Sequence, residues 1–178
     1  MYLALLRGIN VGGKAKLPMK ELAAIFTACG ATAVRTYIQS GNVVFEAKPH
    51  EAAEACVAKV TEEIAKQYGY PGRIVLRSTE ELRETFTHNP FLKAGAVEST
   101  LHVYFLNDLP AAGAVKALDP LRSEPDAFAV HKRAVYLHLP NGMARTKLTN
   151  AYFDSKLKTV STARNWNTIG KLLEMMEA

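Results

Sequence analysis

Apolar and polar positions along the chain follow two different periods, and each change of period predicts a new element. Residues 2–6 form an uninterrupted apolar run, which is typical of a central strand covered on both faces. After it, apolar positions recur three and four residues apart, which predicts a helix with one buried stripe. The stripe consists of Leu22, Ile25, Phe26 and Cys29.

The remainder of the first half continues in the same way. Residues 33–39, 43–46 and 73–77 predict three more strands, and a tight turn at 40–42 joins the first two. Residues 50–68 carry apolar positions at helical spacing and predict a long helix. The order is therefore β-α-β-β-α-β, which is that of a ferredoxin-like unit.

A further helix connects this half to the next. Ser78 and Glu81 have the spacing of a capping box, and the helix that they open stops before Asn89. The second half predicts strands at 100–106, 126–131 and 134–139 and helices at 109–118, 150–160 and 166–176. This β-α-β-β-α pattern nearly repeats the first, with a final helix where a fourth strand is expected.

These elements predict an α+β protein with two tandem ferredoxin-like units of the β-α-β-β-α-β type, the second ending in an extra helix instead of a fourth strand. We expect the first unit to span residues 1–77 and a connecting helix and loop to span 78–99. The second unit, with its C-terminal helices, is expected to span 100–178.

Composition narrows the class of protein. Hydrophobic residues make up 48% of the 178 residues, which is enough for a core and excludes a disordered protein. No apolar run approaches the roughly 20 residues needed to cross a bilayer, and Arg7 interrupts the N-terminal run, which is too short for a signal peptide. We therefore expect a cytoplasmic protein without a membrane partner, with Cys29 and Cys56 reduced and buried. The net charge of +5 favours anionic partners.

The ferredoxin-like order also predicts where three turns meet. The first two strands of such a unit end at the edge of the sheet where the fourth strand begins, which brings together residues 7–10, 39–42 and 71–73. Glycine lets a backbone approach a ligand closely, cations neutralise its charge, and amide and hydroxyl groups orient it. We therefore predict a site for a small anionic ligand, such as a nucleotide or a phosphorylated metabolite. Its residues would be Arg7, Gly8, Asn10, Gly12, Gly13, Lys14, Gln39, Ser40, Asn42 and Arg73. Turn geometry alone is the competing explanation for the glycines.

The glycine-rich loop partly resembles a phosphate-binding P-loop. Residues 8–14 satisfy G-x4-G-K and follow a strand. The next position, Ala15, lacks the hydroxyl that would bind Mg²⁺, and a split antiparallel sheet is the wrong scaffold. We therefore predict a looser anion-binding loop rather than a nucleoside-triphosphatase site, and no cofactor.

The start of the last helix is dense in groups used for recognition. We include Arg164, Asn165, Trp166 and Asn167 in the predicted ligand site, which they would close if the two units pack that way. The structural alternative is that Asn165 is the N-cap and that Trp166, the only tryptophan, anchors the helix in the core.

Aromatic and histidine side chains alternate with apolar ones in two strands of the second half. His102 and Tyr104 lie on one strand, and Tyr136 and His138 on another. RNA-binding sheets place stacking aromatics on such strands, so a module that binds RNA or single strands is an alternative function, although no RNP-type signature is present. We favour a face that packs on the other unit or on a second copy in a homodimer. A protein-interaction module without catalysis is a third reading.

Motifs of common enzyme classes are not found. There is no HExxH, no G-x-S-x-G and no CxxC, and the histidines are scattered, so no metal site is predicted. Ser155 and Lys156 are adjacent on a helix but point in different directions, and a solvated surface lysine is the expected reading. We assign no catalytic residue.

Five stretches resemble a bacterial family known only as domain of unknown function 1697. They are residues 5–14, 36–44, 89–91, 155–157 and 164–168, and they follow one another along nearly the whole chain. The resemblance implies the fold of that family, which is similar to two ferredoxin-like units in tandem. It also implies that the signature stretches matter together. No activity, cofactor or substrate comes with it.

Overall fold

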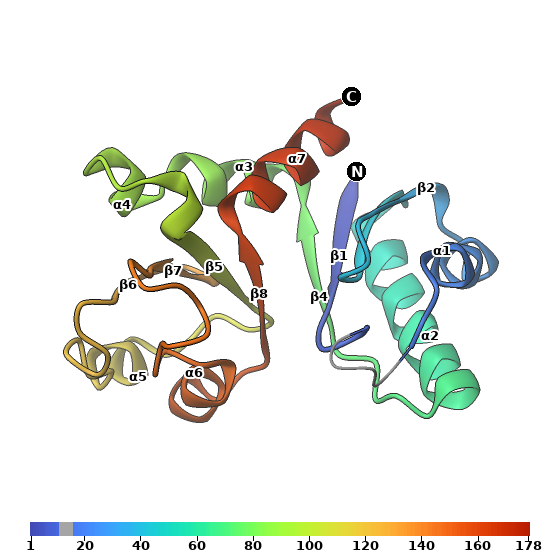
Figure 1. Cartoon of the computed structure of the whole chain (residues 1–178). Helices are drawn as coiled ribbons and strands as arrows, with labels where there is room; N and C mark the ends of the chain where they lie inside the picture. The colour runs from blue at the N-terminus through green and yellow to red at the C-terminus, as the bar shows by residue number, and fades with distance from the viewer. Residues whose placement is uncertain (11–15) are drawn as a thin grey trace. The chain divides into compact units, whose positions relative to one another are not determined.

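The computed structural model describes residues 1–10 and 16–178 and has an α+β architecture (Figure 1). In the described residues, the strands form two four-stranded antiparallel sheets with the orders β2-β3-β1-β4 and β6-β7-β5-β8. The predicted class, α+β, is therefore confirmed. The chain divides into a first compact unit, residues 1–83 with 171–178, and a second unit, residues 84–170.

Strand β1 (Tyr2–Leu6) lies in the middle of the first sheet. It pairs antiparallel with β3 (Asn42–Glu46) and with β4 (Ile74–Ser78), and β2 (Thr32–Tyr37) completes the sheet beyond β3. Because the last four residues of β1 are buried, the strand needs apolar side chains on both faces, which explains its unbroken apolar run.

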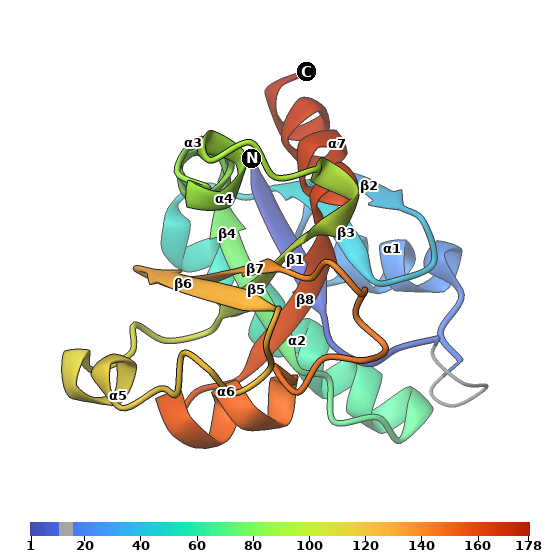
Figure 2. The same cartoon turned by 60° about the vertical axis from the view of Figure 1, so that its left-hand side comes forward.

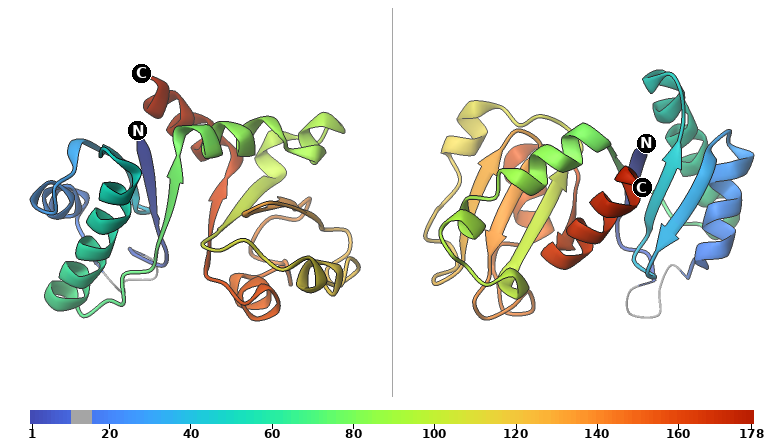
Figure 3. Two further views of the ribbon diagram at one scale, coloured as in Figure 1. Left: turned by 180° about the vertical axis from the view of Figure 1, so that it is seen from behind. Right: turned by 90° about the horizontal axis from the view of Figure 1, so that it is seen from above.

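Two helices cover one face of this sheet, α1 (Met19–Ala28) and α2 (His50–Tyr68) (Figure 3). The predicted stripe of α1 faces the sheet, with Leu22 and Phe26 fully buried. The ring of Phe26 packs against that of Phe45 in β3, with centroids 5.2 Å apart. This contact fixes α1 on the sheet, because aromatic pairs add to the free energy gained from burial alone.

The connecting helix α3 (Thr79–Thr87) begins with the predicted capping box. The N–H of Glu81 donates to Ser78 Oγ at 3.3 Å, and the N–H of Ser78 donates to the Glu81 carboxylate at 3.0 Å. Each residue thus satisfies a backbone donor at the start of the helix that would otherwise have no partner.

The second sheet repeats the arrangement of the first. Strand β5 (Leu101–Leu106) lies in the middle between β7 (Ala134–His138) and β8 (Ser161–Asn165), and β6 (Ala127–His131) is beyond β7. All of its pairings are antiparallel.

Helices α5 (Ala112–Lys116) and α6 (Asn150–Leu157) lie on one face of this second sheet (Figure 2). The short α4 (Pro90–Lys93) contacts β7, and a 3-10 turn at Glu98–Thr100 leads into β5. The other face of the sheet therefore also has a cover within this unit, which keeps its apolar side chains out of water.

The expectation that the second unit ends in an extra helix instead of a fourth strand is wrong, because β8 is that strand. It pairs with β5 from Leu106↔Ser161 to His102↔Asn165. The helix expected at 150–160 ends earlier, at Leu157, and Lys158 adopts a left-handed φ of 56° that turns the chain. The strand was missed because its sequence is mostly polar, although most of it is buried.

The last helix, α7 (Trp166–Glu177), follows β8 directly. Its final residues belong to the first unit, where Glu177 accepts a hydrogen bond from the Arg83 guanidinium at 2.8 Å. None of the helices that the structure describes has both the length and the apolar character needed to span a bilayer.

Candidate functional site

Three turns that are far apart in the sequence meet at one edge of the first sheet. The N–H of Arg7 donates to the carbonyl of Arg73 at 2.9 Å, and the N–H of Leu6 donates to the carbonyl of Gly41 at 2.8 Å. The segment after β1, the bend between β2 and β3 and the approach to β4 are therefore tied together by backbone hydrogen bonds. The topological prediction that these turns are neighbours is confirmed, whereas a ligand at this edge stays a prediction.

Gly41 and Gly8 both have a positive φ at this edge, but their surroundings differ. Gly41 has a φ of +73°, and a Cβ there would lie 2.7 Å from Leu6 Cβ and 2.8 Å from Ile9 Cδ1. Gly8 has a φ of +71° and is exposed, and a Cβ there would meet only the Tyr70 hydroxyl, at 3.9 Å. Turn geometry and packing thus account for Gly41, while Gly8 leaves its backbone open to an approaching molecule.

The amide of Asn10 binds the backbone of two other segments. Its Nδ2 donates to the carbonyls of Leu17 and Gln39 at 3.0 and 2.9 Å, and its Oδ1 accepts from the N–H of Leu17 at 2.8 Å. Its donors and acceptor thus bind the backbone of Leu17 and of the bend between β2 and β3. The side chain therefore has a structural role, and the ligand-orienting role predicted from the sequence stays a prediction.

Asn42 has a similar internal role. Its side chain is fully buried, and Nδ2 donates to the Tyr37 carbonyl at 3.0 Å and to Ser40 Oγ at 2.9 Å. Asn42 and Ser40 therefore stabilise the bend between β2 and β3. Besides the partly exposed Asn10 and Ser40, four predicted residues of this edge are exposed or partly exposed, and we call these four the arginine edge: Arg7, Gly8, Gln39 and Arg73.

The rest of the predicted glycine-rich loop, with Gly12, Gly13 and Lys14, lies outside the described residues. Its resemblance to a P-loop therefore stays a prediction.

The predicted residues at the start of α7 lie in the second unit and have structural roles there. Asn165 Oδ1 accepts from the N–H of Thr168 at 2.8 Å, so the N-cap alternative is correct. Trp166 is buried, whereas Asn165 and Asn167 are exposed.

Arg164 is also largely buried, with 7% of its surface exposed. Its guanidinium donates to Thr162 Oγ1 at 2.9 Å and to the Ala163 carbonyl at 2.7 Å. These contacts with its own strand hold the guanidinium in place, which does not favour the predicted role in closing a ligand site.

A family model described as "Protein of unknown function (DUF1697)" matches residues 1–136. The chain belongs to the DUF1697 family. The resemblance seen in the sequence is thus confirmed, and the matched residues include the whole arginine edge.

A solved structure supports the fold of this DUF1697 chain. It is described as "The structure of conserved bacterial protein SP0830 from Streptococcus pneumoniae", and it superposes with a TM-score of 0.75. The identity is 24%, and the match covers 99% of this chain and 98% of the other. At this identity the likeness concerns the fold alone. No match was found among curated proteins.

The aromatic face proposed for nucleic acid does not exist in the DUF1697 chain. Strand register places His102 opposite Leu137 and Val103 opposite Tyr136. Because opposed residues point to the same face of a sheet, the pair in β5 and the pair in β7 lie on opposite faces. The hydroxyl of buried Tyr104 donates to the Leu148 carbonyl at 3.1 Å, and that of Tyr136 to Thr85 at 2.9 Å. Both tyrosines are core residues.

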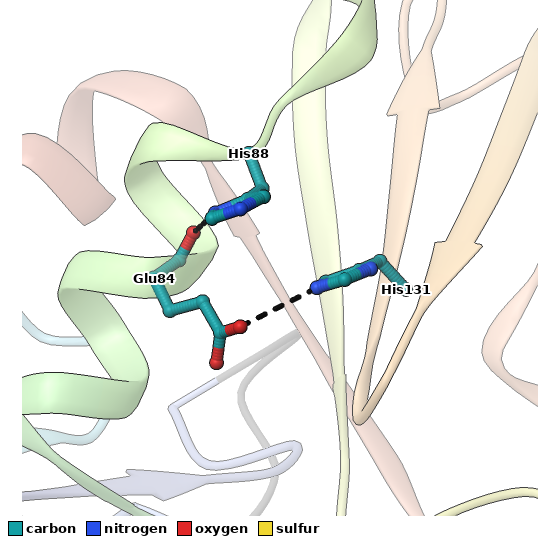
Figure 4. Close-up of side chains that lie close together, drawn as sticks. All are labelled: Glu84, His88 and His131. Atoms are coloured by element: carbon teal, nitrogen blue, oxygen red, sulfur yellow. Dashed lines mark hydrogen bonds and ion pairs between the residues drawn. The ribbon is translucent and has the colours of Figure 1, made fainter.

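Sequence reasoning missed a cluster in the second unit formed by Glu84, His88 and His131 (Figure 4). Glu84 is on α3, His88 follows that helix directly, and His131 ends β6. The contact with Lys132 holds the pKa of the Glu84 carboxyl below its usual range, and the contact with His131 lowers this pKa to a smaller extent. The spacing of Glu84 and His88, four residues apart on one helical face, was a readable signal, but His131 joins them only through the fold.

Two hollows in the surface of the described residues are lined by residues other than those of the arginine edge. A groove of about 590 Å³ over α1 and α2 is lined in part by Glu21, Cys29 and Tyr68. The Tyr68 hydroxyl donates to the Glu21 carboxylate, which raises the pKa of the tyrosine. Burial raises the pKa of the Cys29 thiol, which makes it a poor nucleophile at neutral pH.

A second hollow, of about 400 Å³, lies in the second unit. Its lining includes Arg122, Arg145 and Lys147, and the Ser123 hydroxyl at its wall donates to Asp126 at 2.8 Å. This hollow offers positive charge without the glycine backbone of the arginine edge, so it provides a control for the binding experiment below.

Proposed function

We propose that the chain binds a small phosphate-bearing anion at the arginine edge of the first sheet. The observation that carries the proposal is the 2.9 Å hydrogen bond from the Arg7 N–H to the Arg73 carbonyl. It brings two arginines from opposite ends of the unit's sequence to one edge. Arginine suits phosphate because its planar guanidinium donates two parallel hydrogen bonds to two oxygens.

The neighbours of these arginines support the proposal. Gly8 is exposed and has no side chain, so an anion can approach the backbone beside Arg7. Gln39 is exposed on the adjoining bend, whose backbone is held by Asn10. In this arrangement Arg7 and Arg73 neutralise charge and Gln39 orients the anion. The amides of Asn10 and Asn42 hold the backbone of the adjoining bend between β2 and β3.

The fold proposal is that each sheet with its two helices is a ferredoxin-like unit. If the strands of each unit are numbered one to four along the chain, both sheets have the order 4-1-3-2, which corresponds to β4-β1-β3-β2 and β8-β5-β7-β6. Arg77 and Arg164 support the repeat, since each is the penultimate residue of its unit's last strand and each donates to a neighbouring carbonyl at 2.7 Å. The boundaries 1–77, 78–99 and 100–178 are proposed for these repeats.

A cytoplasmic location is part of the same proposal. It is supported by Cys29 and Cys56, which are both free thiols. Free cysteines are the rule in a reducing compartment.

The proposal is tested by thermal shift with inorganic phosphate, nucleotides and sugar phosphates. A ligand at 100 times its dissociation constant stabilises the folded state by about 2.7 kcal/mol. We expect that stabilisation in the wild type, its loss in Arg7→Ala and Arg73→Ala, and partial retention in Arg7→Lys, which keeps the charge but not the planar fork.

Arg145→Ala is the matched control, because it removes an exposed arginine from the hollow of the second unit. It should leave the ligand-induced shift unchanged. If no anion stabilises the wild type, or if the shift survives in both edge variants and disappears in Arg145→Ala, the arginine edge is not the binding site.

A further inference from the structure

Glu84, His88 and His131 form a compact cluster of possible metal ligands within the second unit. One ligand atom from each lies within 4.8 Å of the other two. We propose that these three side chains bind a divalent transition-metal ion. The site is separate from the anion site proposed above, and neither depends on the other.

The His88 ring is already held as metal-binding histidines are. Its Nδ1 lies 2.9 Å from the Glu84 carbonyl oxygen, which can only accept a hydrogen bond. The hydrogen of a neutral imidazole therefore belongs on Nδ1, and Nε2 keeps the lone pair that can bind a metal. A backbone carbonyl bound to the second nitrogen is a common way to fix the orientation of a ligating histidine.

The other two ligands face one another. His131 Nε2 lies 3.5 Å from Glu84 Oε1 (Figure 4). Two ligands of a tetrahedral zinc ion, with metal–ligand distances near 2.1 Å, are about 3.4 Å apart. This pair therefore already has the separation that an ion requires. His88 is exposed and completes the set, with a ligand atom within 4.8 Å of those of Glu84 and His131.

The ligand types select the class of metal. Two imidazole nitrogens and one carboxylate suit Zn²⁺, Co²⁺, Ni²⁺ or Cu²⁺, whereas Mg²⁺ and Ca²⁺ prefer oxygen ligands throughout. Both histidines are exposed, which leaves further coordination positions for water or another ligand. A set of three protein ligands with an open position is the pattern of zinc sites that interact with a further molecule.

Lys132 competes with the metal for the carboxylate. Its ammonium lies 2.5 Å from Glu84 Oε1, and its side chain is 62% exposed. An ion pair with an exposed lysine is weak, so a metal ion can displace the lysine. The lysine nevertheless lowers the affinity, and its removal should strengthen metal binding.

The same cluster has a reading without metal. The rings of His88 and His131 stack with centroids 5.2 Å apart and 3° between their planes. The His88 ring also caps the end of α3 through the Glu84 carbonyl. In this reading the cluster joins the helix to the hairpin, and transition metals would bind no better to the wild type than to a variant that lacks one histidine.

Metal binding is measured on the full chain, with no polyhistidine tag, by calorimetric titration with Zn²⁺ and by absorption with Co²⁺. We expect one ion per chain, no heat with Mg²⁺, and a Co²⁺ spectrum without the charge-transfer band of a thiolate ligand. The absence of that band separates this site from Cys29 and Cys56.

Variants assign the ion to the cluster. His88→Ala and His131→Ala should each weaken Zn²⁺ binding by roughly tenfold or more. Lys132→Gln should strengthen it by up to about fivefold. The control is His138→Ala, which removes a partly buried histidine outside the cluster and should leave the affinity unchanged. Wild-type binding that both single-histidine variants retain, or that His138→Ala also abolishes, would overturn the proposal, as would the lack of Zn²⁺ binding by the wild type.

Discussion

The indole of Trp166 stacks on the ring of Phe86, with centroids 4.9 Å apart and only 7° between the planes. Trp166 opens α7 and Phe86 lies near the end of α3, so the contact joins the two helices that follow the last strands of the sheets. Only 1% of the tryptophan surface is exposed. Its Nε1–H is buried and has no hydrogen-bond partner in the described part of the chain.

Replacing Trp166 by alanine should lower the free energy of unfolding by about 3–5 kcal/mol, because the substitution leaves a large cavity. Trp166→Phe should cost less than half as much, since it keeps a stacked ring and removes the unsatisfied N–H. Urea unfolding followed by far-UV circular dichroism measures both, because the only tryptophan is lost as a fluorescent probe. Equal losses in the two variants would show that the stack contributes little.

Gly41→Ala tests how tightly the edge of the first sheet is packed. An alanine there has both a φ of +73° and a Cβ within 2.7 Å of Leu6, so we expect a loss of about 2–5 kcal/mol. Gly30→Ala is the control, because Gly30 has a φ of +99° and no atom within 4 Å of its Cβ position. It should lose only the conformational part, about 1–2 kcal/mol. Similar losses in the two proteins would contradict the packing argument.

Ile38 is a β-branched residue in a left-handed conformation, with a φ of +48°, and 50% of its surface is exposed. Asparagine tolerates this conformation and isoleucine does not, so Ile38→Asn should raise the free energy of unfolding by roughly 0.5–1 kcal/mol. Leu109→Asn replaces another exposed apolar residue, 69% exposed, and should give no gain. If denaturant titration shows the same change for both, surface polarity rather than backbone strain is responsible.

His102 makes stability depend on pH. Burial lowers the pKa of its imidazole below the usual 6.5, and its Nδ1 has no hydrogen-bond partner among the described residues. As the pH falls through about 6.5, the unfolded chain binds a proton that the folded chain does not, so the free energy of unfolding decreases until the folded pKa is reached. His102→Gln removes this contribution. Urea titrations at pH 7, 6 and 5 should therefore show a smaller acid-induced loss for the variant, and parallel losses would rule out His102 as the cause.

Burial was the feature of the fold that could be predicted best from the sequence. The apolar run of β1 and the helical periodicity of residues 50–68 gave those elements at the observed positions, because each buries an apolar face that the sequence displays. Strand β8 (STARN) shows no apolar run or apolar periodicity in its sequence. Its buried positions include Ser161, Thr162 and Arg164, whose polar groups find partners only after the strand has paired.

The candidate site also has features that could be predicted from the sequence and features that could not. Strand order alone predicted that Arg7 and Arg73 meet, since topology fixes which strand ends share an edge. The roles of Asn10 and Asn42 could not be predicted, because an amide that binds a ligand and one that binds backbone have the same sequence signature. Strand register could not be predicted from the sequence either. Alternation within β5 and within β7 assigns residues to the two faces of each strand. Only the pairing of the strands shows that Tyr104 and Tyr136 point to opposite faces of the sheet.

The Asn10 amide holds the backbone of this edge through contacts that involve no side chain of the arginine edge. It ties Leu17 and Gln39 together through their carbonyls, so the contact does not depend on which side chain occupies position 39. Under the proposed function, exchanging Gln39 or Arg73 would therefore change the preference for one anion over another without removing the contacts of Asn10. If the edge binds an anion as proposed, its specificity would be open to redesign by surface substitutions that leave the backbone support intact.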